Sequence, residues 1–200
     1  MTLASTLFGY IIGLPMGIVL TVTDKDGIRP NAAVYKVLDV ISNLLRSIPF
    51  IILLIVLIPF TRFVVGRSYG STATIVPLTI AAAPYIARMV ESSLKEVDAG
   101  VIEAAGSMGA SDFQIVTKVM LVEARTSLIV GATISLGTIL GYSAMAGTVG
   151  GGGLGDIAIR YGYTRWQTDI MVVTVVLLVI LFQIFQTIGM KIANRLDRRK

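Results

Sequence analysis

Residues 170–190 read IMVVTVVLLVILFQIFQTIGM and contain no charged side chain. A membrane-spanning helix needs about 20 mainly apolar residues to cross about 30 Å of hydrocarbon, so this stretch is long enough to cross alone. Residues 1–23, 68–87 and 126–155 are charge-free runs of the same kind. These runs are apolar on every face, which excludes the alternating pattern of a β-barrel. The sequence therefore predicts an all-α integral membrane protein.

The composition of the whole chain agrees with this class. Of 200 residues, 54% are hydrophobic and 14% are charged, and the mean hydropathy is +0.82, which lies outside the range of ordinary soluble domains. Cysteine and histidine are both absent, which excludes disulfides, thiolate or imidazole metal sites, and histidine-assisted nucleophiles. We therefore expect no catalytic residue, no metal site and no cofactor.

A fifth span is predicted around the shorter apolar run 47–61. Arg46 precedes this run, and its side chain can extend to the interface so that a helix over about 42–65 crosses. Pro49 and Pro59 in this span, and Pro77 and Pro84 in the next, should kink or locally open the helices. The first run lacks a basic segment and a clear cleavage site, so we interpret it as a span and not as a signal peptide. The expected single domain, 1–200, has spans at about 2–23, 42–65, 68–88, 126–147 and 169–190.

The positive charges predict the orientation of these five spans. Grouping the first connection, the third connection and the tail on one side collects twelve Lys and Arg residues there, against four on the other side. Because positive residues gather in the cytoplasm, the N-terminus is expected outside and the C-terminus inside, with Arg46 near the cytoplasmic end of the second span. The net charge of +5 is explained by topology, so we expect no nucleic-acid partner for the RLDRRK tail. The twelve residues are Lys25, Arg29, Lys36, Arg88, Lys95, Lys118, Arg125, Lys191, Arg195, Arg198, Arg199 and Lys200, and the four are Arg62, Arg67, Arg160 and Arg165.

Glycine spacing points to close helix packing. Gly9, Gly13 and Gly17 recur every four residues, which removes three side chains from one helix face. Gly137 and Gly141 repeat the pattern in the fourth span. We favour a packing role for these glycines over contact with a substrate.

The connection 91–125, between the third and fourth spans, is the longest and most charged. A short helix through Glu103 to Met108 can end at Gly109, because glycine accepts left-handed backbone geometry. Ser111 and Gln114 have the spacing of a capping box and predict the start of a second helix. Phe113, Val116 and Met120 then follow at helical spacing and give a narrow apolar face. Two short cytoplasmic helices joined by a glycine turn can either dock a soluble partner or pack on the bilayer face.

The same connection resembles the EAA loop of ABC importer permeases. Glu103, Ala104 and Ala105 are followed by Gly109 four positions later, and then by Val119 and Leu121. Val119 replaces the isoleucine of the family pattern, and Val122 stands where its proline is expected, which changes the exit from the loop. In that family the loop forms a coupling helix that sits in a groove of the ATP-binding subunit. The resemblance implies that Glu103, Ala104, Ala105 and Gly109 dock there.

The resemblance extends over almost the whole chain, from about Gly9 to the tail, and is closest to permeases of the methionine-importer type. It is carried by residues 43–50 (NLLRSIPF), 75–79 (IVPLT), 83–91 (APYIARMVE), 141–147 (GYSAMAG) and 151–155 (GGGLG). Family members usually have further residues before the first span. The resemblance implies a homodimer that forms the translocation path and works with two ATP-binding subunits, an extracytoplasmic methionine-binding protein and membrane lipid. The implied location is the bacterial cytoplasmic membrane, where the subunit is multi-pass.

The energy source is expected to lie outside this chain. The predicted spans contain no Asp or Glu, and Asp39 and Asp169 lie at span edges, where we expect solvated capping. No GxxxxGK[ST] motif occurs, so the chain has no P-loop for a nucleotide. Together with the resemblance, which implies transport of D- and L-methionine, this predicts a transport subunit without enzymatic activity of its own. A permease for another small amino acid or an osmolyte, and a channel, are the alternatives.

Two motifs near the end of the fourth span have weaker interpretations. Residues 148–152 (TVGGG) lack the tyrosine and the preceding half-helix of a potassium filter. Gly150, Gly152 and Gly155 satisfy GxGxxG without a preceding strand, so a flexible turn is the simpler interpretation. Tyr142, Ser143 and Met145 mix hydroxyls and a thioether with small residues, and we expect them to line the translocation path at the dimer axis.

Overall fold

The computed structural model describes residues 1–197, and all regular elements in this range are helical. Arg198, Arg199 and Lys200, which belong to the charge count above, lie outside the described residues. In chain order the elements are α1 (Thr2–Thr23), α2 (Ala32–Ser47), α3 (Phe50–Val56), α4 (Ile58–Val65), α5 (Ser71–Lys95), α6 (Ala99–Ser107), α7 (Asp112–Gln114), the π-helix η1 (Ile115–Met120), α8 (Leu121–Glu123), α9 (Arg125–Met145), the 3₁₀-helix η2 (Ala146–Val149), α10 (Gly153–Ile157), the π-helix η3 (Ala158–Tyr163) and α11 (Thr168–Leu196).

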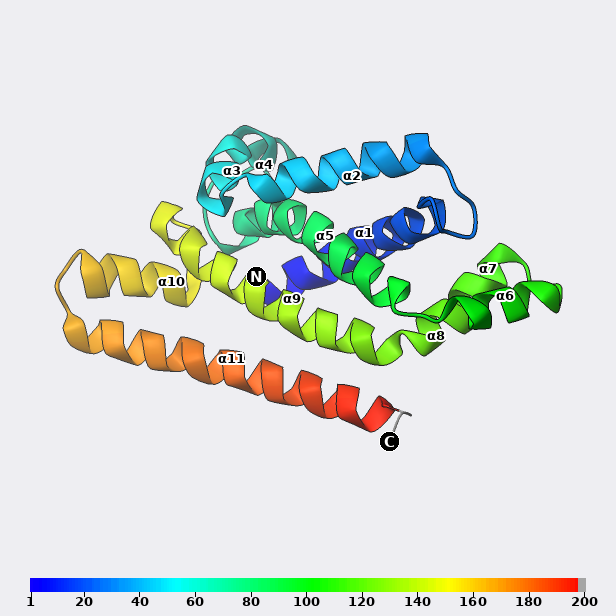
Figure 1. The fold of residues 1–200 in the computed structure, drawn as a ribbon. Coiled ribbons are helices and arrows are strands. Elements are labelled where there is room, and N and C mark those ends of the chain that lie inside the picture. Colours follow the sequence, from blue (N-terminus) through cyan, green and yellow to red (C-terminus); the bar gives the residue numbers. More distant parts are fainter. Residues whose placement is uncertain (198–200) are drawn as a thin grey trace.

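The helices α1, α2, α5, α9 and α11 run along the molecule in alternating directions (Figure 1). At one end, the Thr2 hydroxyl donates to the Ser143 hydroxyl at 3.1 Å, beside the start of α10. At the opposite end, Lys95 pairs with Asp24 at 2.6 Å, and Leu196 shares a cavity lining with residues 96–98. The N-terminus therefore lies at one end, and the connection 24–31, the helices α6–α8 and the end of α11 lie at the other.

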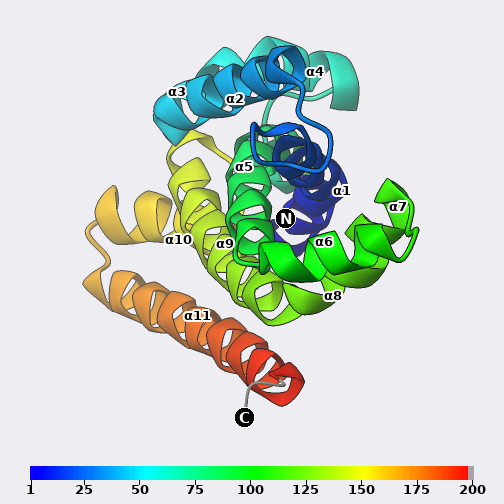
Figure 2. The same ribbon diagram turned by 45° about the vertical axis from the view of Figure 1, so that its right-hand side comes forward.

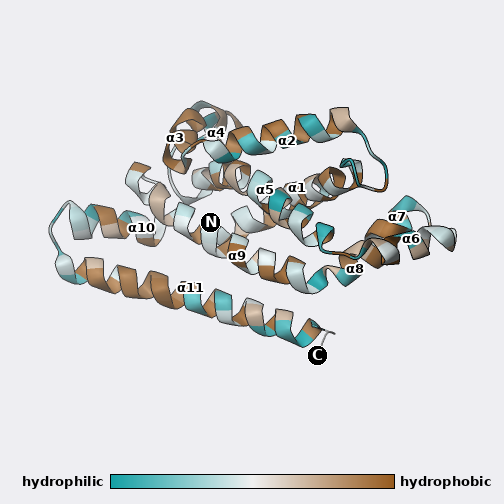
Figure 3. Cartoon of the chain, in the orientation of Figure 1, coloured by the Kyte–Doolittle hydropathy of each residue, from teal (hydrophilic) through white to brown (hydrophobic). Residues whose placement is uncertain are grey.

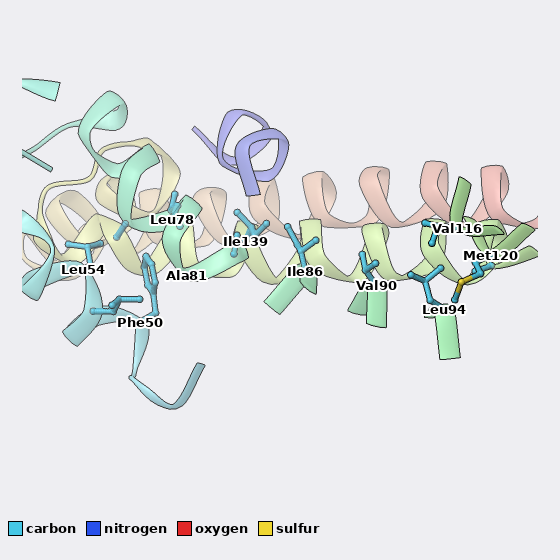
Figure 4. Close-up of a cluster of buried hydrophobic side chains, with 14 of the residues drawn as sticks. Phe50, Leu54, Leu78, Ala81, Ile86, Val90, Leu94, Val116, Met120 and Ile139 are labelled. Carbon is cyan, nitrogen blue, oxygen red and sulfur yellow. The ribbon is translucent and has the colours of Figure 1, made fainter. Parts of the chain in front are cut away.

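Helix α5 forms the centre of the molecule. Leu78, Ile86, Val90 and Leu94 repeat along it and are at most 1% exposed (Figure 4). Their neighbours include Phe50 and Leu54 of α3, Ile139 of α9, and Val116 and Met120 of η1. Pro77 and Pro84, where we expected a kink or a local opening, lie inside α5. This helix runs without a break from Ser71 to Lys95.

Glycines bring α1 against α5. A β-carbon added at Gly9 would lie 2.9 Å from Ile86 Cδ1, and one at Gly13 would lie 2.6 Å from the Ala83 carbonyl oxygen. At Gly17 the distance to the Ala87 carbonyl oxygen would be 2.5 Å. The two backbones approach so closely that no side chain fits between them. The three glycines spaced four residues apart therefore lie in the interface between α1 and α5.

Helix α11 lies at the edge of the molecule in both views (Figures 1 and 2). It packs on α9, where a β-carbon added at Gly137 would lie 2.6 Å from the Phe182 ring. Gly141 has nothing within 4 Å of such an atom, so its face of α9 is open in the single chain. The surface of α11 is apolar over most of its length and becomes polar toward its end (Figure 3).

The expected helix over 42–65 does not form as one piece. Helix α2 starts at Ala32, and the Asn31 side chain caps it by accepting from the Val34 N–H at 3.2 Å. The axes of α2 and α3 differ by 103°. Ile48 is extended and Pro49 lacks an N–H, so the helix cannot continue there. Pro59 lies in the first turn of α4, where proline is tolerated. As a result Arg46 lies at the end of α2 that is remote from the connection 24–31.

The other helices keep their predicted places with different bounds. Helix α5 extends to Lys95, so the connection to α9 starts later than residue 91. Four helical segments of residues 1–197 are long and apolar enough to cross a membrane, or five if α2 and α3 together form one bent span. The described residues thus contain four or five candidate membrane spans.

The glycine-rich segment after α9 is ordered by hydrogen bonds. The Gly151 N–H donates to the Ala146 carbonyl at 2.9 Å, and the Thr74 hydroxyl donates to the Gly151 carbonyl at 3.3 Å. The helical run of α10 and η3 follows at 153–163, where the sequence indicated only a flexible turn. No strand precedes the GxGxxG motif in the described part of the chain, so a dinucleotide fold is absent there.

Candidate functional site

The projecting end of the molecule is built from α6, α7, η1 and α8 (Figure 2). Asp98 caps α6, its carboxylate accepting from the Gly100 N–H at 2.8 Å. Ala105 is buried in the core cluster, whereas Glu103 and Ala104 are exposed. The small buried alanine lets α6 lie against the core, and the two residues before it face outward.

Gly109 makes the turn after α6. Its φ of +82° is left-handed, and its N–H donates to the Gly106 carbonyl at 2.9 Å. The following Ala110 N–H donates to the Ala105 carbonyl at 3.1 Å. A β-carbon at position 109 would meet nothing within 4 Å, so the requirement for glycine comes from the backbone and not from space.

The second helical segment begins with the capping box that the sequence predicts. The Gln114 N–H donates to the Ser111 hydroxyl at 3.4 Å, and the Ser111 N–H donates to the Gln114 side-chain oxygen at 2.9 Å. Helical structure then continues through η1 and α8 to Glu123. Val122, where the family pattern has proline, is an exposed residue of α8.

The apolar side chains of this segment separate into two sets. Val116 and Met120 are buried in the core, and Val119 and Leu121 are half-buried against it. Phe113 is 76% exposed, so it does not share the buried face that the spacing predicted.

Met108, on the other side of the glycine turn, is 82% exposed, so the turn has an exposed apolar residue on each side. An ion pair between Arg29 and Asp112 ties this turn to the connection after α1. A flexible thioether and an aromatic ring on a braced knob suit insertion into an apolar groove of another protein. We call residues 99–114 the docking knob.

The three residues predicted for the translocation path lie on different faces of α9. Tyr142 stacks on Phe50, with ring centroids 4.7 Å apart and planes 6° apart. Ser143 is buried and accepts the hydrogen bond from Thr2, whereas Met145 is exposed beyond the open face at Gly141. The structure therefore places Tyr142 in a stacked pair with Phe50 and leaves the Met145 side chain exposed on the surface of α9.

A charged network between α2 and α5 was missed from the sequence. Arg88 pairs with Asp39, donates to the Asn43 side chain at 3.1 Å and pairs with Glu91 at 2.7 Å. The Glu91 carboxylate, in a residue only 4% exposed, also accepts from Lys95 at 2.8 Å.

The network corrects the expectation that the spans lack carboxylates. Glu91 lies within α5, and Asp39 lies inside α2, where it pairs with Arg88 and does not cap the helix. Asp169 lies in the first turn of α11, as a residue at the start of a span should. A spacing of four or seven residues along α2, from Tyr35 to Asp39 and Ser42, was the signal for a polar helix face.

The network reaches the end of α1 through Asp24. Lys95 donates to this carboxylate at 2.6 Å, and that hydrogen bond holds the pKa of the Asp24 carboxyl below its usual value. Ion pairs thus connect α1, α2 and α5 toward the end of the bundle that carries the docking knob. Among residues 1–197, no cluster of three or more Asp, Glu, His or Cys side chains has the arrangement of a metal site.

Comparison with known proteins places the whole chain among membrane transport subunits. Residues 10–200 match the family described as binding-protein-dependent transport system inner membrane component. A probable D-methionine transport system permease protein of Vibrio cholerae is 50% identical over 191 residues, which cover 96% of this chain and 85% of that relative. The D-methionine transport system permease protein of Escherichia coli K12 is 55% identical over 147 residues, which cover 74% of this chain and 68% of that relative.

Solved structures show the same fold. A chain from a structure described as "Inward facing conformations of the MetNI methionine ABC transporter" is 51% identical, with a TM-score of 0.97 over 98% of this chain and 91% of that chain. A chain of an amino acid ABC transporter with histidines shares the fold at a TM-score of 0.74 and 22% identity, over 98% of this chain and 90% of that chain.

Proposed function

Because the chain belongs to the family of binding-protein-dependent transport system inner membrane components, we propose that it is the membrane subunit of an ATP-driven importer for methionine. The observation that carries this proposal is the match of 98% of the chain, at 51% identity, to a chain of a methionine ABC transporter. The subunit is a permease and not an enzyme, and ATP is hydrolysed on partner subunits. The location that fits the family is the bacterial inner membrane, which the chain crosses several times.

Uptake by the reconstituted transporter tests the proposal. The chain is combined in vesicles with its ATP-binding subunit and its methionine-binding protein, and uptake of radiolabelled L- and D-methionine is followed with and without ATP. We expect uptake that requires ATP and the binding protein. Uptake without ATP would identify a channel, and preference for another amino acid or an osmolyte would assign a different substrate.

The docking knob is the proposed contact with the ATP-binding subunit. Glu103, Ala104 and Gly109 lie on it, with Met108 and Phe113 as its exposed apolar residues, while Ala105, Val119 and Leu121 hold it to the core. Motion of the ATP-binding subunits would pass through the knob to η1, which follows it directly in the chain, and then through α8 to α9.

Gly109→Val tests this contact, because valine is strained at a φ of +82° and should tilt α6 against the turn. We expect loss of co-purification with the ATP-binding subunit. Gly66→Val is the matched control: Gly66 has a φ of +77°, open space around it, and a position at the other end of the bundle. Equal co-purification of both variants with normal ATPase stimulation would contradict the docking assignment.

The proposed assembly is a homodimer with the translocation path on its two-fold axis. The open face of α9, with Ile134, Gly141 and Met145 exposed, supports a second copy there, because an apolar face of small and flexible residues suits helix association. Cysteine at Met145 in this cysteine-free chain should react with a small water-soluble thiol reagent in at least one nucleotide state. Protection in every state would remove Met145 from the path; the same labelling at Tyr142 and Ser143 tests those residues separately.

The proposed orientation has the N-terminus outside and the docking knob and C-terminus in the cytoplasm. It is supported by the gathering of the connection 24–31, the segment between α5 and α9, and the end of α11 at one end of the bundle. Positive residues lie in or beside these three segments, namely Lys25, Arg29, Lys95, Lys118, Arg125, Lys191 and Arg195. A reporter active only in the cytoplasm should be silent when fused after Arg67 and active when fused after Lys200. Activity at both positions would contradict this orientation.

A further inference from the structure

A cavity at the bend between α2 and α3, where Arg46 and Ile48 are exposed at the surface of the single chain, combines a cation with aromatic side chains. It has a volume of about 180 Å³ and is lined by Arg46, Phe50, Tyr85 and Tyr142, together with the aliphatic side chains of Leu45 and Leu53. No carboxylate lines it. The cavity is smaller than the pockets of about 300 Å³ and more that hold drug-sized molecules, so a compact ligand suits it.

Arg46 lies at mid-depth in the bundle. The α5 residues that line the cavity beside it, Ala81 and Tyr85, stand near the middle of Ser71–Lys95. An arginine at the middle of a spanning segment is expensive unless it has a partner or a function.

The two arginines that flank the interface of α2 and α5 differ in their partners. Arg88 has two carboxylates and an amide oxygen around it. Arg46 makes no ion pair with any acidic side chain in the part of the chain that the structure describes. A guanidinium presents a planar fork of donors that matches a carboxylate, so Arg46 has the chemistry for an anionic group from outside the chain.

The remaining lining fits the rest of an amino acid. The stacked rings of Phe50 and Tyr142 offer an apolar surface on which a thioether packs well. The Tyr85 hydroxyl lies 3.4 Å from the Thr138 hydroxyl, whose proton also donates to the Ile134 carbonyl at 3.1 Å. The Tyr85 hydroxyl can therefore donate to Thr138, or to a carboxylate when a ligand is bound.

We propose that this cavity is a substrate subsite, in which Arg46 and Tyr85 hold the carboxylate of the transported amino acid and the Phe50–Tyr142 pair holds its side chain. This inference rests on the proposed function, because it assigns contacts to the substrate of that transport. A purely structural role for Arg46 is the alternative, since a cation in the last turn of α2 also interacts with the free carbonyls there.

The test uses the assembled transporter in vesicles, with Leu45→Cys as the single cysteine at the cavity wall. Wild-type uptake of methionine is measured first in the same preparation, so that failure of the proposed function is seen separately. The labelling rate of Cys by an anionic thiol reagent is then measured with methionine and with methionine amide, which has the same side chain without the carboxylate. We expect methionine to slow labelling several-fold and the amide to have no effect.

Substitutions of Arg46 separate recognition of the carboxylate from support of the helix end. Arg46→Gln should abolish the protection and lower uptake at least about tenfold, because a hydrogen bond to a charged group is lost. Arg46→Lys keeps the charge at the helix end but loses the fork, so it should protect only partly. Arg62→Gln removes an exposed arginine of α4 outside the cavity and should leave uptake and protection unchanged.

Three results would overturn the inference while wild-type uptake is intact. They are no protection by methionine in any nucleotide state, equal protection by the amide, and full protection with Arg46→Gln. Co-purification of every variant with the ATP-binding subunit confirms that the complex being labelled is assembled.

Discussion

Helices α5 and α11 are both long and apolar, yet they have opposite environments. In the most apolar 18-residue window of α5, 61% of the residues are buried inside the chain, compared with 6% for α11. The sequence of α5 is rich in alanine, threonine and proline, whereas α11 is rich in valine, leucine and isoleucine. Small side chains permit helices to pack closely, and large aliphatic ones suit contact with lipid tails. Hydropathy predicts that both helices cross, but the size of the side chains distinguishes the central helix from the peripheral one.

Removal of the buried carboxylate in α5 should have the largest effect on stability. Glu91→Ala removes one partner from the largely buried Arg88 and one from the half-exposed Lys95, which should lower the free energy of unfolding by about 3 kcal/mol. Chemical unfolding in mixed micelles measures the change. The control is Arg160→Ala, which breaks a half-exposed pair with Asp156 near the start of α11 and should cost less than about 1 kcal/mol. Equal losses would mean that burial inside α5 is not what makes the network important.

Crowding of the α1–α5 interface should have the next largest effect. Gly13→Ala places a methyl group 2.6 Å from the Ala83 carbonyl, so the two helices must separate, at a cost of about 1–3 kcal/mol. Gly141→Ala, on the open face of α9, meets nothing within 4 Å in the single chain. The monomeric subunit in detergent should lose stability with the first change and keep it with the second. The reverse order would contradict the assignment of the tight interface.

The ion pair between Lys95, at the end of α5, and Asp24 should make a contribution to stability that depends on pH. The pKa of Asp24 is lowered in the folded chain by the hydrogen bond from Lys95, so between this pKa and the ordinary value of about 3.9 the unfolded chain binds more protons. The stabilisation is therefore complete at neutral pH and is lost as pH falls from about 4 through the lowered pKa. Asp24→Asn should be less stable than the wild type at pH 7, by up to about 1 kcal/mol because Lys95 is partly exposed, and the difference should shrink at pH 3. A difference that stays constant with pH would exclude the ion pair as its source.

The same substitution in the two helices provides the finest comparison. Val176→Leu adds a methylene group on the exposed side of α11 and should change stability by no more than about 0.5 kcal/mol. Val90→Leu adds it where α5 is 1% exposed and should cost about 1–3 kcal/mol. Comparable effects at both sites would show that α11 is packed against something within the subunit as tightly as α5 is.

The apolar runs allowed the helical class and most of the crossings to be predicted from the sequence, because a long charge-free segment has few other stable structures. The turn at Gly109 and the capping box at Ser111 were also predictable, since both depend on residues within a few positions of each other. Local chemistry determines these features.

The second crossing and the charged network were not predictable in the same way. The network joins Asp39 to Arg88, which are 49 positions apart, and only the fold brings them together. Charged residues inside α2 interrupt its apolar run and moved the predicted span toward residues 47–61, although the polar spacing from Tyr35 to Ser42 was visible as a helix pattern. The cavity at Arg46 depends on the bend of 103° between α2 and α3 at Pro49, because its lining combines Ile48 of the bend with residues of four helices, α2, α3, α5 and α9.

The length of α11 has a consequence for the bilayer around it. Its 29 residues extend about 44 Å, whereas the charge-free part 170–190 extends about 32 Å, close to the thickness of the hydrocarbon layer. The last turns, which carry Lys191 and Arg195, therefore reach the depth of the lipid headgroups when the helix stands upright. A thinner membrane must thicken locally around the helix, or the helix must tilt, because few residues of its apolar stretch are buried by the rest of the chain. The peripheral helix thus matches the subunit to a membrane of one thickness.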